Sequence, residues 1–305
     1  MDMNSRFTEQ VRLLVTALPH VARQRCFALK GGTAINLFIR DLPRLSVDID
    51  LAYLPVEDRE ASLAAIDHAL KAIAADIKRA VSGANVHGSV LSGTVTWFKL
   101  VVERGGVRIK IEVTPVLRGS VYAPDLRELV PCAQDEFGYV QMQVLSFEDL
   151  YAGKLCAALD RQHPRDLFDV RLLLAEEGIT PRLKDAFLVY LLSHNRTMAE
   201  LLAPARKDIE GLYNGEFAGM AVEPISLESL YETRQEMIAT VQRSLTEQDR
   251  QFLMAVKRGD ADWSKFPLPE AKDLPAVRWK MHNLSLMDND KRQKALHSLE
   301  RVLYG

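Results

Sequence analysis

The chain has 305 residues, of which 48% are hydrophobic and 26% are charged, and its formal net charge is −2. This composition excludes collagen, coiled coils and disordered chains, and the balanced charge excludes attraction of nucleic acid by the protein as a whole. The length predicts two domains, because single hydrophobic cores stop growing at about 250 to 300 residues.

The sequence contains no apolar run of about eighteen residues, and its N-terminal residues are too polar for the apolar core of a signal peptide. We therefore expect a cytoplasmic protein with no membrane partner.

Three cysteines, Cys26, Cys132 and Cys156, lie far apart without CxxC spacing. This pattern predicts reduced thiols rather than a disulfide framework or a zinc site.

The first predicted elements alternate between helix and strand. Apolar residues at helical spacing predict a helix over residues 5–18, which Pro19 ends or kinks. A short buried strand at 26–30 leads into a glycine pair, and a new helix is expected at Thr33, whose hydroxyl is a good N-cap. Strict alternation of apolar and polar residues then predicts a strand over 46–54.

An alanine-rich amphipathic helix is expected over residues 57–81, followed by strands in "VHGSV", "GTVTWFKLVVE" and "VRIKIEVTP". Residues 1–144 thus predict an α/β domain with a mixed sheet. Residues 145–305 predict an all-helical domain, so the whole chain has an α+β fold. Its helices are expected from 146 to 161, and over 164–177, 181–193, 197–213, 226–258 and 288–303.

Two aspartates in the predicted strand 46–54 are the first candidates for catalysis. Side chains two residues apart on a strand share a face, so Asp48 and Asp50 project together. Their charges repel unless a cation lies between them. Magnesium suits such a pair, because it binds through a few carboxylates and takes other ligands from water and substrate phosphates.

The turn Gly31-Gly32-Thr33 precedes the two aspartates and is a candidate cradle for those phosphates. Glycine lets the backbone approach a ligand closely, and the N-terminus of a helix offers unpaired N–H groups. In "RIKIEV", Glu112 lies on the polar face of a later strand. It is the candidate third metal ligand, which would complete a site for metal-assisted phosphoryl or nucleotidyl transfer. DxD alone is common on exposed strands, so the ordered combination carries the prediction.

Four segments resemble, in order, the motifs of one enzyme family. They are "KGGTAINLFIRDLPRLSVDIDLAY", "RIKIEVTP", "SFEDLYAGKLCAALDR" with its lysine, and "RDLFDV" with its aspartate. The chain is similar over residues 28–175 to the AbiEii-type nucleotidyltransferase toxins. These form a branch, with the MenT toxins, of the DNA polymerase β-like nucleotidyltransferase superfamily.

In the first motif, the resemblance implies that Asp48 and Asp50 hold the metal and that Gly32 and Thr33 contact the triphosphate. Family members more often have Ser after the glycine, and Thr33 keeps the hydroxyl. Relatives can be silenced by phosphorylation of that hydroxyl residue, which would be Thr33 here. Glu112 stands where an Asp is frequent.

In the helical half, the resemblance implies that Lys154 binds phosphate or the base and ribose of the nucleotide, and that Asp166 assists catalysis. The residues alone leave other interpretations open. Lys154 lies in an apolar helix and must meet an anion or extend to the surface. Asp166 stabilises the helix dipole in the first turn, or pairs with Lys154 or Arg165 on an inward-facing stripe.

The family implies an enzyme that uses Mg²⁺ or Mn²⁺ to transfer a nucleoside monophosphate from an NTP to the 3′ end of tRNA. Such a product would block translation, and a cognate antitoxin would restrain the enzyme. The oligomeric state is not indicated. Two alternatives remain: a nucleotidyltransferase that modifies a protein hydroxyl or a small molecule such as an aminoglycoside, and a catalytically inactive binding module.

Eight basic residues of the helical half are candidates for a stripe that faces RNA, with a solvated helix surface as the alternative. They are Arg196, Arg206, Lys207, Arg278, Lys280, Lys291, Arg292 and Lys294.

Overall fold

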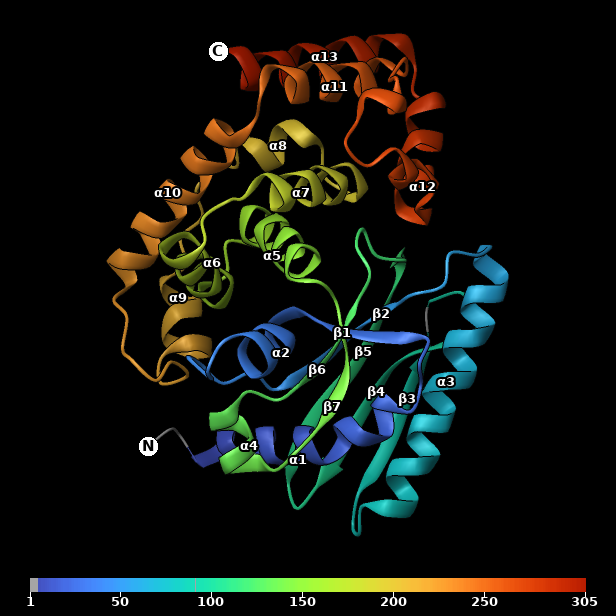
Figure 1. Ribbon diagram of the computed structural model, residues 1–305, viewed down its shortest axis with the longest axis vertical. Coiled ribbons are helices and arrows are strands. Elements are labelled where there is room, and N and C mark those ends of the chain that lie inside the picture. Colours follow the sequence, from blue (N-terminus) through green and yellow to red (C-terminus); the bar gives the residue numbers. More distant parts are fainter. Residues whose placement is uncertain (1–4, 91) are drawn as a thin grey trace. The chain divides into compact units, whose positions relative to one another are not determined.

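The computed structural model describes residues 5–90 and 92–305, which form two compact units (Figure 1). The first unit ends at Ser146 and also contains Phe217–Pro224, while the second unit holds the remaining residues. The chain therefore passes between the units at three points, of which the sequence indicates only the first.

Within the described residues of the first unit, seven strands form one mixed sheet in the order β3-β4-β5-β2-β1-β7-β6. The pairs β2–β5 and β1–β7 are parallel, and the other neighbours are antiparallel. With the helices, this sheet confirms the predicted α+β class. The strands are β1 (Phe27–Lys30), β2 (Asp48–Tyr53), β3 (Asn85–Val90), β4 (Trp97–Arg104), β5 (Val107–Arg118), β6 (Asp125–Glu128) and β7 (Gln141–Val144).

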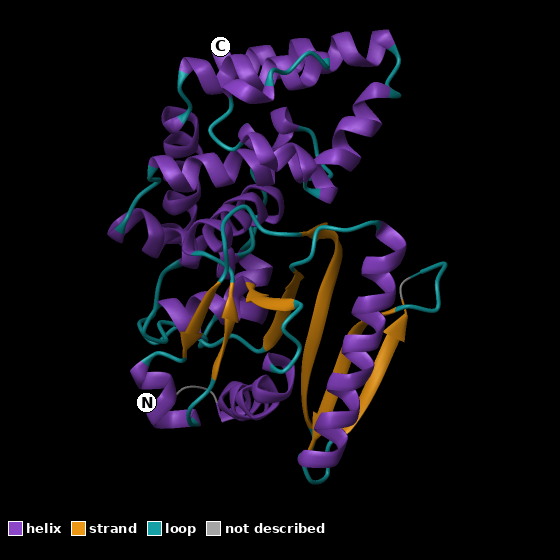
Figure 2. Cartoon of the chain, turned by 45° about the vertical axis from the view of Figure 1, so that its right-hand side comes forward, coloured by secondary structure: helices purple, strands orange, loops and turns teal. Residues whose placement is uncertain are grey.

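Alternation along β2 and β5 separates an apolar face of the sheet from a polar one. The apolar face is buried and includes Ile49, Leu51, Ile109, Ile111 and Val113. Helices α1 (Ser5–Ala22) and α3 (Arg59–Ala80) pack against the sheet, and Figure 2 shows α3 lying across its long strands. Helix α1 continues to Ala22 with Pro19 inside it, so Pro19 does not end the helix.

The connection between β1 and β2 starts with α2 (Gly31–Ala34), which continues as a π-helix over Ile35–Ile39. The helix begins at Gly31 with Lys30 at the N-cap position, so the prediction of Thr33 as N-cap is wrong. Further along, the backbone N–H of Leu45 donates to the carbonyl of Met220 at 2.9 Å. This hydrogen bond ties the returning segment Phe217–Pro224 to the loop before β2.

The second unit is built from helices within its described residues. They are α5 (Phe147–Arg161), α6 (Pro164–Glu176), α7 (Pro181–Ser193), α8 (Met198–Leu202), α9 (Glu210–Leu212), α10 (Leu227–Ser244), α11 (Glu247–Arg258), α12 (Pro275–Ser285) and α13 (Asn289–Tyr304). The single helix expected over 226–258 is two helices, because Thr246 and Asp249 form a capping box that starts α11.

Some short elements were missed in the sequence. They are β6, α4 (Pro131–Phe137) and β7, which follow one another in the sequence, and α12, which has Pro275 at its first position. These segments carry too few periodic residues to stand out. No helix in the described part of the chain is both long enough and apolar enough to cross a membrane.

Candidate active site

The two candidate aspartates lie at the beginning of β2, between β1 and β5. In the parallel pairing of β2 with β5, Asp48 is opposite Lys110 and Asp50 is opposite Glu112. On the other side, Asp50 is opposite Lys30 of β1. Paired residues of neighbouring strands project on the same side of a sheet. The carboxylates of Asp48, Asp50 and Glu112 therefore belong to one face, on two adjacent strands.

Glu112 is drawn toward a different partner on that face. The ammonium of Lys99 on β4 lies 3.5 Å from Oε2 of Glu112, in a partly exposed ion pair. Among the residues that the structure describes, no three His, Cys, Asp or Glu side chains converge closely enough to hold a metal ion. The donor set that remains is Asp48 and Asp50, which suits an ion that takes further ligands from water and phosphates. Glu112 as a third ligand stays a prediction.

Gly31 brings the backbone of the turn directly against Asp50. Its φ of +74° is in the left-handed region, and a Cβ atom built on it would lie 2.6 Å from Oδ2 of Asp50. Both the conformation and the lack of space require glycine here. Gly32 faces elsewhere, since a Cβ atom there would lie 2.8 Å from Nη2 of Arg44 and 3.0 Å from the hydroxyl of Ser46.

Thr33 fastens the turn to the strand that carries the aspartates. Its hydroxyl donates a hydrogen bond of 2.5 Å to the backbone carbonyl of Asp48 and lies 3.0 Å from the hydroxyl oxygen of Ser46. The side chain is fully buried. The hydroxyl that the family resemblance assigns to the triphosphate, and to phosphorylation, is therefore directed into the interior of the first unit.

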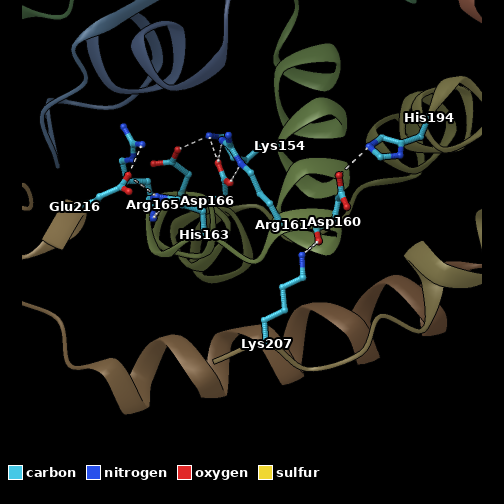
Figure 3. A network of polar contacts seen from close by, with 10 residues as sticks. Lys154, Asp160, Arg161, His163, Arg165, Asp166, His194, Lys207 and Glu216 are labelled. Carbon is cyan, nitrogen blue, oxygen red and sulfur yellow. Dashed lines mark hydrogen bonds and ion pairs between the residues drawn. The ribbon is translucent and has the colours of Figure 1, made fainter. Parts of the chain in front are cut away.

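A second cluster of charges lies in the helical unit, where α5 meets α6 (Figure 3). The ammonium of Lys154 lies 3.0 Å from Oδ1 of Asp166 and 2.9 Å from Oδ2 of Asp169. Arg161 adds two hydrogen bonds to Asp166, of 2.5 Å from Nε and 2.9 Å from Nη2. Asp166 and Asp169 have no exposed surface, and Lys154 is 6% exposed.

The charges of this cluster stabilise one another. Burial alone would raise the pKa of Asp166, but Lys154 and Arg161 beside it hold that pKa well below the usual range. Asp166 therefore keeps its negative charge although water does not reach it. Of the two partners open to Asp166 from the sequence, the structure selects Lys154.

Arg165 contacts Glu216 instead, with its Nη2 3.5 Å from Oε2 of that residue. His163 caps α6 and accepts from the backbone N–H of Arg165 at 3.1 Å through Nδ1. Its Nε2 then carries the proton and donates to Glu216 at 3.2 Å. Burial lowers the pKa of His163, although Glu216 opposes that shift.

The sequence analysis does not predict the ion pair between Arg161 and Asp166. Its position seven residues after Lys154 is a usable signal, because residues i and i+7 share one face of a helix. Two cations on the face that meets an acidic stripe indicate a buried ionic cluster rather than a single pair.

The sheet, its candidate turn and the following helices have the fold of a nucleotidyltransferase. The solved structure of the nucleotidyltransferase toxin MenT4 from Mycobacterium tuberculosis H37Rv matches with a TM-score of 0.57. The match covers 98% of this chain and 95% of that chain at 15% sequence identity, so it shows a shared fold.

The family follows from the sequence model of the nucleotidyl transferase AbiEii toxins of type IV toxin–antitoxin systems, which matches residues 12–283. The chain belongs to this family. Comparison with curated proteins found no match.

The contact between Gly31 and Asp50 can be tested against a glycine without neighbours. Gly83 has a φ of +75° and no atom within 4 Å of an added Cβ atom. Both Gly31→Ala and Gly83→Ala should lower the free energy of unfolding by about 1 to 2 kcal/mol, because alanine disfavours the left-handed backbone conformation. Gly31→Ala should lose more, because its methyl group displaces Asp50. Urea unfolding of both variants measures the difference, and equal losses would contradict the proposed contact.

The buried cluster predicts a pH-dependent effect of Asp166→Asn. At pH 7 the variant should lose about 3 to 5 kcal/mol of stability, because Lys154 and Arg161 then lose the buried carboxylate that they share and Lys154 keeps only Asp169. The folded-state pKa of Asp166 is lowered, so its contribution is present above the unfolded pKa and is lost as the pH falls through the folded value. The difference from the unsubstituted protein should therefore shrink below about pH 4.

Urea unfolding between pH 3 and pH 7 measures this difference. The control is Asp260→Asn, which removes an exposed partner 3.2 Å from Arg258 and should cost less than about 1 kcal/mol. A similar cost for both substitutions, or a cost for Asp166→Asn that does not depend on pH, would show that the buried charges are not coupled.

Proposed function

We propose that this protein transfers a nucleoside monophosphate from an NTP to the 3′ end of tRNA with Mg²⁺, and thereby blocks translation. The observation that carries the proposal is the placement of Asp48 and Asp50 on one strand face, with the Gly31 turn against Asp50. The family supports the transferase and toxin parts of the proposal. The acceptor and the metal rest on the resemblance and on the chemistry of the two carboxylates.

In this mechanism, the oxygen of the acceptor hydroxyl bonds to the α-phosphorus of the NTP, the bond to pyrophosphate breaks, and the proton of the hydroxyl is released to water. Asp48 and Asp50 would hold Mg²⁺, or Mn²⁺ in its place. When bound, such an ion neutralises charge on the attacking and leaving oxygens. Gly31 keeps side-chain atoms out of the space beside Asp50, and Thr33 holds the backbone of Asp48 in register with the turn.

Lys154 would act on the nucleotide, and Asp166 would act through Lys154. An ammonium that binds phosphate must keep both its charge and its position. Asp166 and Asp169 supply both conditions from two consecutive turns of α6, and Arg161 donates hydrogen bonds to both carboxylate oxygens of Asp166. We therefore assign Asp166 and Asp169 as positioning residues in the proposed reaction.

A toxic tRNA-modifying enzyme needs a restraint, and the type IV toxin–antitoxin family supports a cognate antitoxin as partner. The cytoplasm is the proposed location, because tRNA and NTPs are present there.

Transfer can be tested with each labelled NTP, incubated with the protein, Mg²⁺ and tRNA, protein extract or aminoglycosides. We expect label in tRNA, lost when EDTA replaces Mg²⁺. Label only in protein or in a small molecule would overturn the tRNA acceptor. Absence of label from all acceptors, with growth inhibition unaffected by Asp50→Asn, would favour a binding module.

The substitutions Asp48→Asn and Asp50→Asn should each lower the transfer rate at least about 100-fold, because metal binding contributes several kcal/mol to the transition state. The matched control is Glu103→Gln on β4, which lies on the same sheet face and pairs with Arg108. It should retain the rate. A loss as large for Glu103→Gln as for Asp50→Asn would mean that the polar face as a whole, rather than the aspartate pair, is required.

A further inference from the structure

A cavity of about 310 Å³ lies among α8, α11 and α13 of the helical unit. Its apolar wall includes Met198, Ala295 and Leu299. Three lysines also line it, Lys257 from α11 and Lys291 and Lys294 from α13. A concave apolar site with a few convergent charges is the usual form of a small-ligand site.

Lys257 is the unusual member of this group. Its side chain is only 5% exposed, yet among the described residues it makes no hydrogen bond and no ion pair. An isolated buried ammonium is costly, and buried charges in proteins are normally paired. Burial lowers the pKa of Lys257, and the nearby guanidinium of Arg292 lowers it further. Lys257 therefore brings to the cavity an amino group that no described carboxylate pairs with.

Two further cations, Arg292 and Lys280, form their hydrogen bonds with backbone carbonyls rather than with carboxylates. Arg292 donates through Nη2 to the carbonyl of Leu284 at 2.8 Å, and the ammonium of Lys280 on α12 donates to the carbonyl of His194 at 2.6 Å. Burial and the proximity of Lys257 lower the pKa of Lys280 to about 8. Glu200 opposes this shift of the Lys280 pKa, and the lowered pKa values of Lys257 and Lys280 reflect positive charges that lie close together.

Two carboxylates nearby are already engaged. Glu200 lines the cavity, and its carboxylate accepts from the backbone N–H of Thr197 at 3.4 Å as part of the capping box of α8. Asp288 pairs with Lys291 at 3.4 Å in an exposed contact. The residues that line the cavity include three lysines and one glutamate, so an anionic ligand would bring the charge of the lining closer to balance.

We infer that this cavity binds a phosphate group, with Lys257 at its base and Lys291 and Lys294 at its rim. Lysine is a compact donor that contacts phosphate as a point charge, and the apolar wall strengthens the attraction by excluding water. The phosphate can belong to an RNA backbone or to a free nucleotide. The RNA source rests on the proposed function, whereas binding of phosphate itself does not.

The first test measures thermal unfolding of the full chain against increasing inorganic phosphate, with chloride at the same ionic strength as reference. The unsubstituted protein should show a saturable rise in the unfolding temperature beyond that in chloride. Lys257→Met should lose this rise and, without phosphate, should unfold at a higher temperature, because an uncompensated buried charge is gone.

The control is Lys265→Met, which removes an exposed lysine of the same unit and should keep the phosphate response. Phosphate also stabilises proteins through exclusion from their surface, so the inference depends on the difference between Lys257→Met and Lys265→Met. Equal phosphate responses in these two variants would overturn it. If Lys257→Met does not fold, the double variant Lys291→Met/Lys294→Met decides, with a weakened phosphate response expected and an unchanged one overturning the site.

The second test distinguishes the sources of the phosphate by the binding of labelled tRNA at several salt concentrations. If RNA is the ligand, Lys257→Met should bind about tenfold more weakly, with a salt dependence reduced by about one counterion. Unchanged RNA affinity together with a lost phosphate response would identify a free nucleotide or phosphate. Asp50→Asn should retain the phosphate response, so failure of the proposed transfer and failure of this site give different results.

Discussion

The structure of the candidate site depends on one close contact, that between the backbone of Gly31 and the carboxylate of Asp50. A methyl group at this position would overlap Oδ2 of Asp50, and the left-handed backbone disfavours any side chain. A second constraint acts two residues later, where the buried hydroxyl of Thr33 bonds the backbone of Asp48. The turn and the aspartate strand thus form one rigid piece, and each aspartate is adjacent to a different residue of the turn.

In the helical unit, by contrast, charged side chains are buried together. Asp166 and Asp169 are completely buried, and their cost is offset by Lys154 and Arg161 rather than by water. Such a cluster gives little net stability compared with an apolar core, but it allows few alternative arrangements of its side chains. In the lysine cavity of the same unit, compensation is incomplete, and Lys257 remains without a described partner. The charges around Lys154 are therefore paired within the protein, whereas we infer that Lys257 is paired by a bound anion.

Local sequence patterns predict the strands that carry the candidate acids, because alternation along a strand depends only on neighbouring residues. The alternation in "SVDIDLAY" and "RIKIEV" predicts both strands and the faces of their acids, and the sheet pairs Asp50 with Glu112. Patterns could not show that Lys99 attracts Glu112, or that the Thr33 hydroxyl is turned inward, because both depend on residues distant in the sequence. Helix spacing indicated a partner for Asp166, yet not that Arg161 would join Lys154.

The return of Phe217–Pro224 to the first unit has a consequence for biosynthesis. The loop before β2 is completed by a β-bridge between Arg44 and Ala221 and by the hydrogen bond from Leu45 to Met220. When all strands of the sheet have been synthesised, the segment Phe217–Pro224, which contacts this loop, has therefore not yet been translated. The first unit reaches its full set of contacts only after the helices α5 to α9 and the segment Phe217–Pro224 have been translated.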